Sequence, residues 1–191
     1  MFLTLRNFLK RDDGSLSVEA VIILPVILVV FMATYTYFDL FRAKSQSLKA
    51  NYAISDMLSR DDNILKTELK GAGKLFRYLT QSSPNSWVAV TVVRCKRNCD
   101  KANRRLVVAG SRDQNWNRHL TTSQLRAHYK DLIPKMYQGE YLLMVETKAP
   151  YIPPFHGDWH GIYPVEMTDL VITKPRDAPK ICFENADCNP T

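Results

Sequence analysis

Hydrophobic positions dominate one stretch near the start of the chain. Residues 20–38 are apolar apart from two threonines, and the carboxylate of Glu19 stands directly before them. A bilayer core of about 30 Å needs roughly 20 apolar residues in a helix, so this stretch is long enough to cross a membrane. We therefore predict a transmembrane helix over residues 15–38.

A cleaved secretory signal peptide is the alternative for this stretch. Such a peptide has an apolar core of about 7–15 residues, followed by small residues at the cleavage site. Bulky side chains between Phe31 and Tyr35 stand where those small residues would be needed. The pattern therefore favours a helix that stays in the membrane.

Helical periodicity continues beyond the apolar stretch, because neither Gly nor Pro occurs over residues 39–60. Phe41, Leu48 and Tyr52 recur at helical spacing, with Leu58 near the same stripe. One helix from about Leu16 to about Leu58 would be roughly 64 Å long at 1.5 Å per residue. We expect half of it to face lipid and half to pack on the rest of the chain.

The remaining residues, 39–191, predict a single domain that combines helices with a small antiparallel sheet. After the long helix we expect a second helix over about 64–79, with caps from Asp61-Asp62-Asn63. A hairpin of strands 87–93 and 106–109, joined across the loop 95–103, should follow, and then a third helix from Ser123 to about Tyr137 that Thr121 or Thr122 caps. Two further strands are expected at 140–147 and 163–173. A long helix followed by an antiparallel sheet is an α+β layout.

Charge adds one local feature to this pattern. The net charge is +7, and its densest patch lies on the predicted hairpin loop, with Asp100 as the single opposing charge among Arg94, Lys96, Arg97, Lys101, Arg104 and Arg105. A solvated loop is one interpretation, and contact with anionic lipid, an acidic partner or nucleic acid is the other. No nucleic-acid motif accompanies the patch, so we expect no specific nucleic-acid binding.

Four cysteines stand outside the apolar stretch, at positions 95, 99, 182 and 188. In an oxidising compartment an even number of cysteines favours disulfides, and three connectivities are possible. We favour Cys95–Cys99 and Cys182–Cys188, each of which closes a small loop. The alternative is a zinc site in which Cys95 and Cys99 join His156 and His160, although these pairs are far apart in sequence.

No catalytic pattern stands out in the sequence. A Gly-x-Ser-x-Gly elbow, a phosphate-binding loop and a His-Glu-x-x-His zinc motif do not occur. We therefore expect a non-enzymatic protein without a cofactor.

A resemblance to a known family rests on three motifs in chain order. The first is Asp13-Gly14-Ser15 with Val18-Glu19 at the start of the apolar stretch; the second is Leu-Ile-Pro-Lys-Met at 132–136 with Gly-Glu-Tyr-Leu-Leu-Met-Val-Glu at 139–146; the third is Tyr-Ile-Pro-Pro-Phe at 151–155 with Thr-Lys-Pro-Arg at 173–176. With these motifs the whole chain resembles the TadE/TadF-like minor pseudopilins of the tight-adherence (Tad, Flp-type) pilus system. Major pilins of that system are far shorter.

The resemblance implies a pilus assembly subunit of the type IV class that supports adherence and biofilm formation. Residues 1–14 would be a leader that a prepilin peptidase removes by cutting between Gly14 and Ser15. The carboxylate of Glu19 would then meet the new N-terminal amine of a neighbouring subunit during assembly. Implied partners are that peptidase, other Tad pseudopilins and pilins, the inner-membrane assembly platform and membrane lipid.

The resemblance also implies a location. The protein would cross the inner membrane once, with a cytoplasmic N-terminus and a periplasmic domain, and it could enter the pilus. Basic residues on the two sides of the span are nearly balanced, so charge alone does not orient it. The alternative function is a single-pass, membrane-anchored periplasmic binding or adhesin module that is unrelated to assembly.

Overall fold

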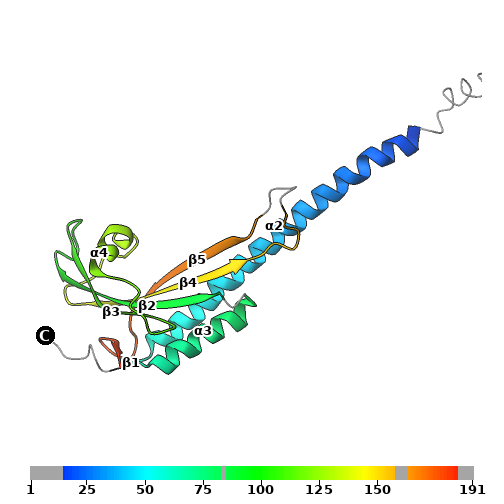
Figure 1. The fold of residues 1–191 in the computed structure, drawn as a ribbon. Coiled ribbons are helices and arrows are strands. Elements are labelled where there is room, and N and C mark those ends of the chain that lie inside the picture. Colours follow the sequence, from blue (N-terminus) through cyan, green and yellow to red (C-terminus); the bar gives the residue numbers. More distant parts are fainter. Residues whose placement is uncertain (1–14, 83–84, 158–162, 185–191) are drawn as a thin grey trace, which may run out of the picture.

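A computed structural model describes residues 15–82, 85–157 and 163–184 of the chain (Figure 1). The described elements, in chain order, are α2 (Ser15–Ser59), β1 (Asn63–Ile64), α3 (Lys66–Thr80), β2 (Trp87–Arg97), β3 (Arg105–Asp113), α4 (Thr122–Gln124), the π-helical turn η2 (Leu125–Tyr129), β4 (Tyr141–Tyr151), β5 (Val165–Thr173) and β6 (Cys182–Phe183). The predicted α+β class is confirmed. The long apolar helix and a small antiparallel sheet account for it.

α2 is one continuous helix, as predicted. It has 45 residues, includes Pro25 without interruption, and is about 67 Å long at 1.5 Å per residue. Its first half projects from the domain, and its second half lies along the sheet (Figure 1). Large apolar side chains on the projecting half, such as Val21 and Phe31, are more than 60% exposed.

The face of α2 that packs on the domain differs from the predicted stripe. Phe41 is 67% exposed and Tyr52 is 57% exposed, whereas Ile54 and Leu58 are fully buried. At 3.6 residues per turn, Leu58 lies roughly 100° around the helix from Phe41. Phe41, Leu48 and Tyr52 of the predicted stripe therefore lie on the surface, and only Leu58, which was placed near that stripe, packs on the domain. The physical reason is that small polar residues line the inner face and bond to the sheet.

Four antiparallel strands form the sheet in the order β3-β2-β4-β5. The predicted hairpin is confirmed as β2 and β3, whose pairing runs from Ala89 opposite Asp113 to Arg97 opposite Arg105. α2 and α3 cover one face of the sheet (Figure 1). The main core lies between them and includes Ile54, Phe76 and Val145.

A second, smaller core covers part of the opposite sheet face. The chain between β3 and β4 folds over this face and buries Leu125 and Met136 against Met144. The predicted third helix is too long here, because α4 and η2 end at Tyr129 rather than Tyr137. Pro134 disfavours helical backbone at the residue before it and has no N–H to continue the hydrogen-bond ladder.

The start of α3 also corrects the prediction. Neither Asp61 nor Asp62 caps it: the Glu68 carboxylate accepts a 2.8 Å hydrogen bond from the backbone N–H of Leu65 instead. The residues before it form β1, which pairs in parallel with β6. This two-stranded pair was not predicted, and it ties the C-terminal part of the described chain to the junction of the two helices.

Candidate functional site

The head of α2 carries the residues that the pilin resemblance singled out. Gly14 lies outside the described residues, and Ser15 is the first residue of α2. Glu19 follows one turn later and is exposed. No described residue forms a hydrogen bond or an ion pair with its carboxylate. Within the described chain, Glu19 thus leaves its charge open to a partner from outside.

Among the described residues, one helix is long and apolar enough to cross a membrane, and its most apolar window is not covered by the rest of the chain. This helix is α2. A core helix of similar composition would have its apolar window buried by the rest of the chain, and here this window is not buried. α2 is compatible with a single-pass membrane anchor.

A polar seam, which we define as Lys44, Ser47, Asn51, Ser55 and Asp169, joins the second half of α2 to the sheet. The side chain of Asp169 is buried, and its carboxylate accepts hydrogen bonds from Ser47 Oγ at 2.9 Å and Lys44 Nζ at 2.5 Å. These charge-assisted bonds compensate for the burial of the carboxylate. The seam thus holds α2 at one rotation against β5.

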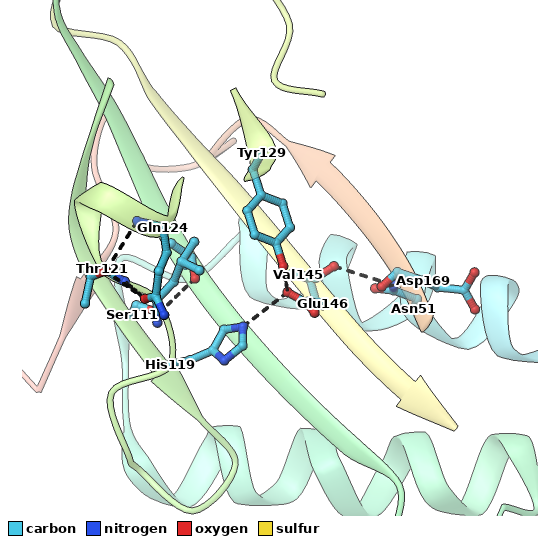
Figure 2. Close-up of polar contacts among 11 residues, drawn as sticks. Asn51, Ser111, His119, Thr121, Gln124, Tyr129, Val145, Glu146 and Asp169 are labelled. Carbon is cyan, nitrogen blue, oxygen red and sulfur yellow. Dashed lines mark hydrogen bonds and ion pairs between the residues drawn. The ribbon is translucent and has the colours of Figure 1, made fainter. Parts of the chain in front are cut away.

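Asn51 extends the seam to two strands. Its side-chain amide donates to the backbone carbonyl of Asp169 at 3.0 Å and approaches that of Val145 at 3.5 Å (Figure 2). Farther along, the hydroxyls of Ser55 and Thr173 are 3.2 Å apart. Sequence reasoning missed these contacts, although the four-residue spacing of Ser47, Asn51 and Ser55 marks one helix face and could have indicated it.

A second polar cluster lies on the opposite face of the sheet. One oxygen of the Glu146 carboxylate accepts a hydrogen bond from Tyr129 Oη at 3.0 Å and lies 3.1 Å from His119 Nε2 (Figure 2). Trp87 packs edge-on against the His119 ring, with 4.6 Å between ring centroids. These contacts fasten both ends of segment 119–129 to β4.

Electrostatics in this cluster favour an ionised carboxylate. Burial opposes ionisation of Glu146, but the bonds from His119 and Tyr129 outweigh it and hold the pKa of Glu146 below its usual value. Burial and the adjacent Glu146 raise the pKa of Tyr129 to about 12, so the phenol stays a donor at neutral pH. The arrangement is a stable anchor for the covering segment.

The cysteine prediction is confirmed for one pair. Cys95 and Cys99 form a disulfide at the end of β2, with 5.9 Å between their Cα atoms. Because these sulfurs are bonded to each other, they are not available as the thiolate ligands of the alternative zinc site. Cys182 lies in β6 and has no free thiol. Cys188 lies outside the described residues, so the second pairing stays a prediction.

The zinc alternative also names two histidines, His156 and His160. His156 Nδ1 lies 2.8 Å from the carbonyl of Pro153, and His160 is outside the described residues. Within the described ranges, no group of three or more His, Cys, Asp or Glu side chains could hold a metal.

Two members of the basic patch have structural contacts. The guanidinium of Arg104 donates to the carbonyls of Lys130, Ile133 and Pro134, which the broken third helix leaves without helical partners. Arg94 lies over the Tyr141 ring, 5.4 Å from its centroid. The other four, Lys96, Arg97, Lys101 and Arg105, are exposed. The sequence pattern did not separate these two groups.

Comparison with known proteins gives no match: no family model, no curated protein and no solved structure matches this chain.

Proposed function

We propose that this protein is a non-enzymatic minor pilin, or pseudopilin, in the assembly of a Tad/Flp-type pilus. A prepilin peptidase would process it, and the assembled pilus would support adherence and biofilm formation. The observation that carries the proposal is the form of α2. A single helix, α2, leaves its apolar half uncovered and packs its other half on a small antiparallel sheet.

Glu19 supplies the chemical argument for assembly. A carboxylate near the head of a membrane-spanning helix costs free energy unless a positive charge neutralises it. No described residue pairs with Glu19, and we propose that the neutralising group comes from a neighbouring subunit. The N-terminal amine of a neighbouring subunit, set free when the leader is cut, has the required charge.

The large exposed side chains of α2 support contacts with further subunits. Phe41, Leu48 and Tyr52 lie on one helix face that the domain leaves uncovered. Exposed apolar surface of this kind is typical of sites of association. The other Tad pseudopilins and pilins, and the inner-membrane assembly platform, are the proposed partners.

The proposed orientation places the domain in the periplasm and the N-terminus in the cytoplasm. The Cys95–Cys99 disulfide supports this assignment, because such bonds persist in oxidising compartments and are rare in the cytosol.

Processing separates this function from the alternative of an anchored periplasmic binding or adhesin module. In the native host, the mature protein should begin at Ser15 when the peptidase is present and at Met1 when the peptidase gene is deleted. Gly14→Leu should block the cut, because a branched side chain crowds a site suited to glycine. Mass spectrometry of the N-terminal peptide measures both. An intact Met1 in piliated cells would reject the pilin proposal in favour of the anchored module.

A further inference from the structure

The connection between β4 and β5 lies beside α2, near the end of its apolar half. Phe155 packs edge-on against Tyr35 of α2, with 5.9 Å between ring centroids. Just before it in the chain, Tyr151 Oη donates a 2.7 Å hydrogen bond to the Asp39 carboxylate. The connected ends of the two strands lie beside the middle of α2 (Figure 1). Two contacts thus fix the level of this hairpin tip on the helix.

The length of α2 then places the tip relative to a bilayer. The uncharged stretch between Glu19 and Asp39 has 19 residues, or about 28 Å of helix, which barely fills a hydrocarbon core of about 30 Å. The part of that stretch that precedes Tyr35, the residue that Phe155 contacts, is residues 20–34 and provides only about 22 Å of helix. If the helix fills the core, the contact of Tyr35 with Phe155 lies inside the membrane boundary.

The exposed side chains of the tip suit that depth. Ile152 is 55% exposed, Phe155 37% and Tyr163 57%, although all three are apolar or aromatic. Aromatic side chains gather at the boundary between lipid and water. Pro154, which is exposed, has no backbone N–H, so one donor that would otherwise lose water in lipid is absent.

Among the described residues, the charged groups near the tip lie on its domain side; Asp158, in the same connection, is outside the described residues. The ion pair of Lys148 and Glu166, at 2.6 Å, is located farther back along the two strands. Arg42 is exposed one helical turn beyond Asp39, beside an open cleft of about 320 Å³. A cation at this level faces the headgroup layer, where anionic lipids attract it.

We propose that the β4–β5 hairpin tip, defined here as Ile152, Phe155 and Tyr163, inserts into the interfacial layer of the leaflet in which α2 ends. This inference rests on the proposed membrane anchor. The tip provides a second attachment beside the helix, so it fixes the rotation and tilt of the domain on the membrane. Its occupant is lipid rather than protein, because the apolar surface is continuous with that of the spanning helix.

Site-directed spin labelling of the full chain in phosphatidylethanolamine–phosphatidylglycerol vesicles tests this directly. Single cysteines replace Ile152 or Tyr163 in the tip, Val26 in the middle of the span, or Tyr137, which is 83% exposed on the domain. Labelling without reductant keeps the Cys95–Cys99 disulfide closed, and the unsubstituted chain serves as the blank. Accessibility is measured to oxygen, which concentrates in lipid, and to a nickel complex, which stays in water.

We expect the oxygen-to-nickel accessibility ratio at Ile152 and Tyr163 to be several-fold higher than at Tyr137 and below that at Val26. Labels at both tip positions that match Tyr137, while Val26 is in lipid, would overturn the inference and leave the anchor intact. Labels at the tip that neither reagent reaches would also overturn it, by showing a protein partner. A water-accessible Val26 would instead reject the anchor itself. Near-ultraviolet circular dichroism matched to the unsubstituted chain confirms that each labelled variant is folded.

Discussion

At the scale of single residues, buried polar side chains fix how the long helix sits on the sheet. Asp169 accepts bonds from Ser47 and Lys44, and Asn51 bonds to backbone carbonyls of two strands. A purely apolar interface would let the helix slide or rotate at small cost. Directional bonds to buried partners penalise every other register, because each would leave a polar group without a partner.

Asp169→Ala should lower the free energy of unfolding by about 2–3 kcal/mol, since it leaves the buried Ser47 hydroxyl and the half-exposed Lys44 ammonium without their charged partner. Asp56→Ala is the matched control, because Asp56 forms exposed ion pairs with Arg60 and Arg176 and should change stability by less than about 1 kcal/mol. Denaturant unfolding of the full chain in detergent micelles measures both. Equal effects of the two variants would contradict the importance of the seam.

Glu146→Gln should lower stability by about 1–2 kcal/mol at pH 7, because the buried carboxylate loses its charge-assisted bonds. The pKa of Glu146 is depressed in the folded chain, so its stabilisation is present above the ordinary value of 4.5 and is lost as the pH falls through the folded value. The difference between the variant and the unsubstituted chain should therefore shrink in acid.

The control for this variant is Glu166→Gln, which removes an exposed carboxylate on the neighbouring strand. Unfolding curves recorded from pH 7 down to pH 3 compare the two. A gap between Glu146→Gln and the unsubstituted chain that stays constant over this range would show that the carboxylate charge is not the source of stability.

At the scale of elements, the sequence pattern predicted those helices and strands that depend on residues close together in the chain. The long helix, the second helix and the β2–β3 hairpin follow from periodicity and β-branched residues, and the structure has all three. The Cys95–Cys99 bond was predictable because its partners are close in sequence. The Asn51 contact with Asp169 joins positions that are 118 residues apart, so no local pattern could pair them.

The buried face of α2 shows why the sequence did not predict which side of this helix packs on the domain. Size and hydrophobicity favoured Phe41 and Tyr52 as the packing stripe, but the domain binds the face with Ser47, Asn51 and Ile54. Small side chains allow close approach to the sheet, where the Ser47 hydroxyl and the Asn51 amide nitrogen find partners. The large apolar residues on the outer face have no packing role in the described chain, and association with other subunits is the role proposed for them.

Ile54→Ala should cost about 2–5 kcal/mol in the free energy of unfolding, as a large-to-small change in a core does. Tyr52→Ala, on the exposed face two positions away, should change it by less than about 0.5 kcal/mol. Thermal or denaturant unfolding of the full chain in micelles distinguishes them. A larger loss for Tyr52→Ala would mean that the helix packs through the stripe that sequence reasoning chose.

At the scale of the whole molecule, the chain is a rod with a domain on one half. The rod is α2, about 67 Å long, and the sheet and α3 pack against one side of its second half (Figure 1). The uncovered half and the open carboxylate of Glu19 have no role within the described chain. In the proposed function, the uncovered half of α2 holds the protein in a membrane and the Glu19 carboxylate meets another subunit there.

Fibre counting in cells of the native host tests the proposed assembly role most directly. Cells that lack this chain are complemented with the unsubstituted protein, with Glu19→Ala, or with Glu19→Gln, which keeps the shape of the side chain and removes its charge. Removing a carboxylate from an apolar helix makes insertion easier, so a membrane-fraction blot should show equal amounts of all three proteins. We expect pili only with the unsubstituted protein. Normal pili with both variants, or in cells that lack the chain, would contradict the account.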